Sequence, residues 1–228
     1  SSVYTCGIYN GSSNSITISS NAINTLTIKN GIFRGIWENG SASANAVVIS
    51  NNTIGTASAD NINISSTNQN AEGSTAPHSA IFLIGSGTNV TASSNTIQNV
   101  TLSGTPGATG VELVGIYSYL GTKTIISNNI SYLKNSHKGS SNKTFVSGIL
   151  YSGNNTVSIK KNKIQNLINQ STNTSSTIRG IYISGSGTSS IYNNLIKITN
   201  AFKSPPETIS KTLLKAFGFL FSRTLPCL

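Results

Sequence analysis

Carboxylates and histidines are the residues most able to do chemistry in this chain, and both are few. The 228 residues include five acids and two histidines. The acids are Glu38, Asp60, Glu72, Glu112 and Glu207, and the histidines are His78 and His137. Hydrolysis of a polysaccharide needs a pair of carboxylates, and elimination needs carboxylates that hold calcium beside a base. The five acids are scattered and form no such pair, so we expect no catalytic residue.

Metal and cofactor chemistry has no better support in the sequence. Neither histidine has a cysteine or a second histidine at ligand spacing, and we expect both to be solvated loop residues. A phosphate-binding glycine loop and a GxSxG nucleophile motif are also absent from the sequence. The sequence therefore predicts no metal site and no cofactor.

A column of aromatic residues is the strongest candidate for binding. Its members are Tyr9, Trp37, Phe82, Tyr117 and Tyr182, with Leu150 in one further place. Each follows an isoleucine, in the order Ile8, Ile36, Ile81, Ile116, Ile149 and Ile181. Because strand residues alternate between faces, the isoleucines face the core and the aromatics face outward. Stacked flat rings could bind sugars. The alternative is that loops or a neighbouring module cover them, since exposed contiguous aromatics are rare.

The elements that would position this column are short strands in a repeat. A small residue opens each unit, at Gly7, Gly35, Ala80, Gly115, Gly148 and Gly180. A later asparagine keeps step with it, at Asn21, Asn52, Asn95, Asn129, Asn162 and Asn194. The spacings of the two markers agree closely along the chain, which indicates one coil per unit.

The last complete unit, Gly180 to Ile196, shows how each coil is built. Segments 181–183, 189–192 and 195–198 are β-branched or aromatic, and glycine or asparagine separates them. Three such strands per coil predict an all-β, single-stranded, right-handed parallel β-helix of about six coils over residues 1–200. Asparagine tolerates the left-handed backbone of a sharp corner, and stacked asparagines can form a hydrogen-bonded ladder. Long loops, of which 55–79 is the longest, are either binding loops or tolerated surface bulges.

The repeat pattern stops at residue 201, and a different tail follows. Ser204, Pro205 and Glu207 form a helix-start signal, and Ile209 then begins an apolar pattern at near-helical spacing. We expect an amphipathic helix in 201–228 that caps the open end of the β-helix. The alternatives are a membrane-surface helix or an end foreign to the repeat. The apolar stretches between the charged residues of this tail are too short to span a membrane.

Charge and cysteine content constrain the partners. Residues 1–122 carry a formal charge of −2 and residues 123–228 carry +12. An anionic partner would be attracted to the C-terminal half, and of such partners we expect polysaccharide rather than nucleic acid. The favoured alternative is that these lysines are solvated and only keep a weakly charged solenoid soluble. Cys6 and Cys227 lie at opposite ends, about 24 Å apart for six coils, whereas a disulfide spans about 7 Å. We predict no bridge between them within one chain.

The repeats resemble those of the pectin-lyase-like superfamily of parallel β-helix proteins. The resemblance rests on the GIY, GIW and GIL openings and the ISNNTI, SSNTI and IYNNLI corners. It is closest to the Asn/Ser/Thr-rich versions in secreted bacterial surface proteins, and it implies a secreted or cell-surface location. No signal peptide is present, and we take the chain to be a section of a longer protein.

Three functions follow from this resemblance and composition. The first is a non-enzymatic rigid spacer or adhesin section that contacts polysaccharide. The second is a polysaccharide lyase or glycoside hydrolase, which the shortage of acids disfavours. The third is an ice-binding solenoid, but its Thr-x-Thr motifs at 25–27, 122–124 and 172–174 fall out of register.

Overall fold

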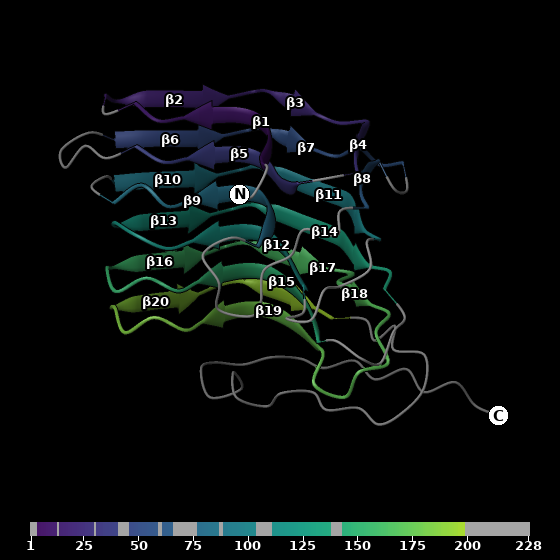
Figure 1. Ribbon diagram of the computed structural model, residues 1–228. Coiled ribbons are helices and arrows are strands. Elements are labelled where there is room, and N and C mark those ends of the chain that lie inside the picture. Colours follow the sequence, from purple (N-terminus) through teal and green to yellow (C-terminus); the bar gives the residue numbers. More distant parts are fainter. Residues whose placement is uncertain are drawn as a thin grey trace.

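The chain winds into a parallel β-solenoid of about five turns (Figure 1). The computed structural model describes residues 4–12, 14–29, 31–40, 46–58, 61–65, 77–86, 89–103, 111–137 and 143–198. Within these ranges, all regular structure is β-strand, and each pairing between strands is parallel. The prediction of a parallel β-solenoid with three strands per coil is confirmed, but the predicted number of about six coils is corrected to about five turns.

Three sheets form the sides of the solenoid, and we name them sheets A, B and C. Sheet A contains β1 (Tyr4–Asn10), β5 (Ile32–Glu38), β9 (His78–Leu83), β12 (Val111–Ser118), β15 (Thr144–Tyr151) and β19 (Thr177–Ile183). Sheet B contains β2 (Ile16–Ser19), β6 (Ala46–Ser50), β10 (Asn89–Ser93), β13 (Lys123–Ile126), β16 (Val157–Lys160) and β20 (Ser189–Tyr192). In Figure 1 each set lies in a stack that runs from the purple to the green end.

Sheet C is more broken than the other two. It contains β3 (Ala22–Ile23), β4 (Leu26–Ile28), β7 (Thr53–Ile54), β8 (Ile62–Ile64), β11 (Thr96–Leu102), β14 (Asn129–Asn135), β17 (Lys163–Gln165), β18 (Ile168–Asn169) and β21 (Leu195–Lys197). β11 and β14 are continuous, whereas three other coils split the same path into the pairs β3 and β4, β7 and β8, and β17 and β18. β8 lies inside 55–79, so the predicted long loop contains one strand of the coil.

The core is the space enclosed by the three sheets, and isoleucine columns line it. The predicted column of sheet A is in register, and its members from Ile36 to Ile181 are buried in the core, with Ile8 partly buried at the end. Equivalent columns come from sheet B at Ile49 and Ile159 and from sheet C at Ile97 and Ile130. β-branched residues fit such strands because they pack well on a pleated, buried surface.

An asparagine ladder fixes the corner between sheets B and C. Its members are Asn21, Asn52, Asn95, Asn128, Asn162 and Asn194, and each side chain from Asn21 to Asn162 donates to the next at 2.9 to 3.0 Å. The ladder prediction holds with one correction: the fourth member is Asn128 and not Asn129. The left-handed residue at this corner is also not the ladder asparagine but the residue before it, such as Asn51 or Lys161.

The small residue that opens each unit sits where the backbone of sheet A comes close to its neighbours. A Cβ on Gly148 would lie 2.6 Å from the carbonyl oxygen of Gly180 and 2.6 Å from Cγ2 of Ile164. Such contacts are too short for a larger side chain, so glycine occupies the position in most coils. The register places Ala80 opposite Gly35, in agreement with its predicted role as the substitute.

The predicted tail helix lies outside the described residues, as do Cys227 and most of the loop 55–79. Cys6 is a free thiol. Within the described part of the chain, no helix is long and apolar enough to cross a membrane.

Candidate functional site

The predicted aromatic column forms a continuous stack on the outer face of sheet A. Strand register places Tyr9 beside Trp37, Trp37 beside Phe82, Phe82 beside Tyr117, Tyr117 beside Leu150 and Leu150 beside Tyr182. Parallel in-register pairing brings these residues together although they come from six different coils. The side chains between Trp37 and Tyr182 form a small apolar cluster with Val114 that is separate from the solenoid core.

Burial along this column is uneven. Tyr9 is 57% exposed, and Trp37 and Tyr182 are partly exposed, whereas Phe82 and Tyr117 are buried. The Phe82 and Tyr117 rings stack with centroids 4.8 Å apart, and the Tyr117 hydroxyl lies 3.0 Å from the Ser152 hydroxyl. The middle of the column is therefore packed, and the surface available to a ligand lies toward its two ends. That all five aromatics bind a ligand remains a prediction.

Arg34 lies against the N-terminal end of this column and was not among the predicted site residues. Its side chain leaves β5 on the same outer face as Trp37. The guanidinium carbon lies 3.1 Å from the Phe82 ring centroid, 4.7 Å from that of Trp37 and 4.9 Å from that of Tyr4. A sequence signal was present, because Arg34 is one of two basic residues before position 123. Its position within the repeat unit was a second signal, because Arg179 stands before a Gly-Ile-aromatic sequence in the same way.

The environment of Arg34 is unusual for a charged group. Only 1% of the residue is exposed, and its Nε and Nη1 atoms have no hydrogen-bond acceptor in the described structure. Burial lowers the pKa of the guanidinium to about 10, although the nearby Tyr4 hydroxyl opposes this shift. Cation–π contacts return about 0.5–2 kcal/mol, but aromatic faces do not replace hydrogen-bond acceptors. The site therefore holds a cation with unused donors.

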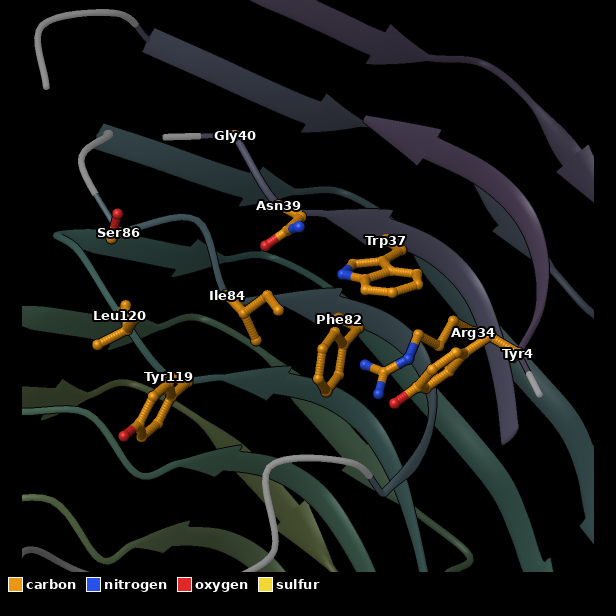
Figure 2. A pocket seen from close by; sticks show the side chains of 10 residues that line it. All are labelled: Tyr4, Arg34, Trp37, Asn39, Gly40, Phe82, Ile84, Ser86, Tyr119 and Leu120. Carbon is orange, nitrogen blue, oxygen red and sulfur yellow. The ribbon is translucent and has the colours of Figure 1, made fainter. Parts of the chain in front are cut away.

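A pocket of about 590 Å³ opens beside this guanidinium. Figure 2 shows the Arg34 side chain between the rings of Tyr4 and Phe82, with Trp37 beside them and Asn39 across the pocket. The wall comes from β1, β5 and β9 and from the segments that follow β5, β9 and β12. The indole Nε1 of Trp37 is also buried without an acceptor in the described structure. An aromatic wall with a few convergent polar groups is typical of small-molecule sites.

The two acids that the structure describes, Glu38 and Glu112, are both engaged by neighbouring groups. Glu38 is buried at the interior corner between sheets A and B, where its carboxylate accepts from the backbone N–H groups of Gly40 at 2.8 Å and Gly85 at 3.2 Å. Lys123 also points inward and donates to the Gly85 carbonyl at 2.9 Å. These contacts link three successive coils through Glu38, Gly85 and Lys123, which is a structural role.

Glu112 lies on the outer face of sheet A in β12, two strands away from the β5 strand that carries Arg34. Its Oε1 accepts from the Ser147 hydroxyl at 3.0 Å and lies 3.8 Å from Nη1 of Arg179. Arg179 in turn lies over the rings of Phe145 and Tyr182, at 4.8 and 4.1 Å. Glu38 and Glu112 thus belong to different sides of the sheet and form no pair. Asp60, Glu72 and Glu207 lie outside the described residues.

The expectation for His78 is wrong. His78 is buried in β9, and its Nδ1 accepts a hydrogen bond from the Phe33 N–H at 3.1 Å. It takes an inward position in the column that holds Phe33 and Leu113 in other coils, because β9 begins earlier than the sequence pattern indicates. His137 follows β14 and is partly exposed. The described residues contain no group of three or more potential ligands that could hold a metal ion.

Comparison with known proteins adds no relative to this description. No protein-family model, curated protein or solved structure matches this chain.

Proposed function

We propose that this solenoid is a non-enzymatic section of a secreted or cell-surface protein that serves as a rigid spacer or adhesin and contacts polysaccharide. The single observation that carries the proposal is the pocket beside Trp37, with aromatic walls and unused hydrogen-bond donors. Sugars present apolar ring faces and polar hydroxyls together, and an aromatic side chain with polar neighbours complements both.

Rigidity is supported by the way the coils are joined. Each coil is bound to the next by three parallel ladders and by the buried asparagine ladder, whose central members Asn95 and Asn128 are shielded from water. Stacked repeats of this type form elongated, quasi-one-dimensional scaffolds. Such a scaffold suits a spacer that holds a binding surface away from a cell.

The finer family assignment is part of this proposal. The repeat openings and corners resemble the pectin-lyase-like superfamily, and parallel strand crossovers are right-handed in nearly all proteins, so we infer a right-handed β-helix of that kind. Its Asn/Ser/Thr-rich members in bacterial surface proteins support the proposed location. The arrangement of the two described acids supports a non-enzymatic role, because Glu38 and Glu112 already accept hydrogen bonds from neighbouring groups.

Truncation of Trp37 tests the proposed function. A glycan array should identify bound polysaccharides, and calorimetry should then show that Trp37→Ala weakens binding by about 10- to 100-fold, because an aromatic stack contributes about 1–3 kcal/mol. Tyr192→Ala is the matched control, since Tyr192 is an exposed aromatic on sheet B and should leave binding unchanged. Release of unsaturated or reducing sugars from a bound polysaccharide would contradict the non-enzymatic role.

A further inference from the structure

The solenoid core is less well covered at its two ends than in its middle. Among the described residues, the apolar side chains that pack against the core but are only partly buried all belong to the first or the last coil. They are Ile8, Ile16 and Leu26 at one end and Ile178, Ile183, Ile191 and Ile196 at the other. Members of the same columns in the middle coils, such as Ile116 and Ile125, are buried. Each terminal coil therefore lacks the cover that a further coil would give it.

The asparagine ladder ends in complementary groups. Inside the solenoid, each ladder asparagine donates its backbone N–H and its side-chain N–H to Oδ1 of the next, as Asn162 does to Asn194 at 3.0 and 2.9 Å. In the described part of the chain, Oδ1 of Asn21 has no such donor, and the backbone N–H of Asn194 has no acceptor. One end of the ladder thus presents an acceptor, and the other end presents a donor.

The strand edges of the terminal coils are complementary in the same way. Inside the solenoid, the residue after each ladder asparagine donates its backbone N–H to the carbonyl of the preceding ladder asparagine, as Leu195 does to Asn162 at 2.8 Å. The equivalent N–H of Ala22 in the first coil has no acceptor within the described ranges. Strands β1 to β4 also contain no charged residue and no proline, which are the features that usually protect an edge strand from pairing.

We propose that copies of this chain bind head to tail, with the first coil of one copy stacked on the last coil of the next. This contact continues the coil-to-coil interface of the solenoid, so the strand pairing fixes its register. It places Ile8 of one copy beside Ile181 of the other, and it places Asn21 beside Asn194. The inference goes beyond the proposed polysaccharide contact and does not depend on it.

A second copy fits the last coil better than the helix predicted for 201–228 does. A helix uses its backbone groups in its own hydrogen bonds, so it would leave the edge groups of the last coil unpaired. The first coil of a second copy supplies strand backbone, an asparagine and apolar columns in one register. Because the two surfaces in contact differ, each added copy leaves a free surface at either end, and the assembly is an open filament.

Cys6 is a natural probe of this contact. Arg179 occupies the same column of sheet A in the last coil, so the contact places Arg179 of one copy beside Cys6 of the next. Neighbouring strands lie about 4.8 Å apart, which a disulfide can span. Within one chain, the two positions lie on opposite edge strands of sheet A, about 24 Å apart, which a disulfide cannot span. A bond between them must therefore join two copies.

The cross-linking experiment uses the full chain with Arg179→Cys and Cys227→Ser, oxidised with diamide. A non-reducing gel should show covalent dimers and longer oligomers, and mass spectrometry should find positions 6 and 179 joined. Ser190→Cys in the same background is the matched control. Ser190 is exposed in the same coil but lies in the column of Thr17 on sheet B, so this variant should give no bond to Cys6.

A second measurement separates the contact from the stability of one copy. Ala22→Pro removes the N–H that would bind the Asn194 carbonyl of the next copy, and it breaks no hydrogen bond among the described residues. Proline is tolerated on an edge strand. In sedimentation equilibrium, the average mass of the wild type should rise about twofold or more with concentration, whereas Ala22→Pro should stay monomeric. Ala22→Ser keeps the N–H and should assemble like the wild type.

The outcomes that overturn the inference are distinct. A wild type that stays monomeric at every concentration, with no cross-link for Arg179→Cys, would mean that another segment covers these ends. Equal cross-linking of Arg179→Cys and Ser190→Cys would indicate random collision. Circular dichroism establishes that each variant is folded, and sedimentation of the wild type and the Ala22 variants carries the test if Arg179→Cys is not. Failure here leaves the polysaccharide contact, which is tested at Trp37, unaffected.

Discussion

A buried ammonium group is the most unusual single residue in the solenoid core. Lys123 begins β13, and strand register places it in the inward column that holds Val90 and Val157 in the adjacent coils. Burial lowers the pKa of Lys123 to about 8, while the nearby Glu38 carboxylate raises it in part. The folded chain therefore binds this proton less tightly than the unfolded chain does, and the protonated form costs stability.

The sign of the resulting pH dependence follows from that shift. Below about pH 8 both states are protonated and the full penalty applies; it disappears as pH rises toward the ordinary pKa of 10.5. The free energy of unfolding should therefore increase across this window relative to Lys123→Met, by at most about 3 kcal/mol. Urea unfolding at several pH values measures it. Lys163→Met, an exposed lysine, is the control, and a constant difference between wild type and Lys123→Met would contradict the prediction.

At the scale of elements, the corner between sheets B and C depends on two residues with separate tasks. The first takes the left-handed backbone, as Ser94 and Ser127 do, and the second contributes the ladder asparagine. In the fourth coil, the sequence Ser127-Asn128-Asn129 offers two adjacent asparagines, and spacing alone did not distinguish them. Register decides between them, because Asn129 begins β14 and pairs with Thr96 and Lys163 instead.

Replacement of Asn128 should be costly because many groups depend on its amide. Its Oδ1 accepts from the Asn95 backbone and side-chain N–H groups at 3.0 and 2.9 Å, and its Nδ2 donates to Ala92 and Asn162. Asn128→Ala leaves these buried groups unsatisfied and should lower the free energy of unfolding by about 2–4 kcal/mol. Asn129→Ala should cost less than about 1 kcal/mol. Denaturant unfolding compares them, and equal losses would contradict the assignment of the ladder.

At the scale of the whole molecule, each coil contacts only its neighbours. Long-range order therefore comes from repetition, and no single centre holds the chain together. Sheets A and B each have six strands in sequence order, so a coil can in principle be removed without changing the path of the others. Ser147 and Arg179 occupy equivalent positions in adjacent coils, which defines one such unit.

Deletion of residues 147–178 should give a shorter solenoid that still folds. The deletion joins Val146 to Arg179, which then takes the position of Ser147 in the strand register. Sheets A and B each lose one strand, and sheet C loses the pair β17 and β18. A coil that contributes about 3 kcal/mol would lower the melting temperature by about 6–12 °C. Deletion of residues 147–162 removes half a coil and should abolish cooperative unfolding in circular dichroism. Similar melting of the two variants would contradict independent coils.

The sequence by itself determined how this chain winds. Isoleucine and asparagine recur in every coil, and the opening glycine recurs in all but the third, where Ala80 replaces it. This periodicity identified the three strands, the inward isoleucine column and the outward aromatic column. Segment 189–192 was predicted with the bounds that β20 has, since asparagine and glycine flank it on both sides. The segment Ile181 to Ile183 was correctly predicted as a strand, but the predicted strand was too short. The observed strand β19 begins four residues earlier, at Thr177.

Only the tertiary structure decided what those columns do. Burial of Phe82, the cation beside it and the pocket depend on which coil lies next to which, and these neighbours are distant in sequence. Glu38, His78 and Lys123 are likewise buried. Their residue types predict exposure, so only the path of each strand reveals that they lie inside. A repeat specifies the positions that every coil shares, whereas arginine takes the position of Arg34 in two coils, here and at Arg179. The partners that give each arginine its surroundings become visible only when the coils are stacked.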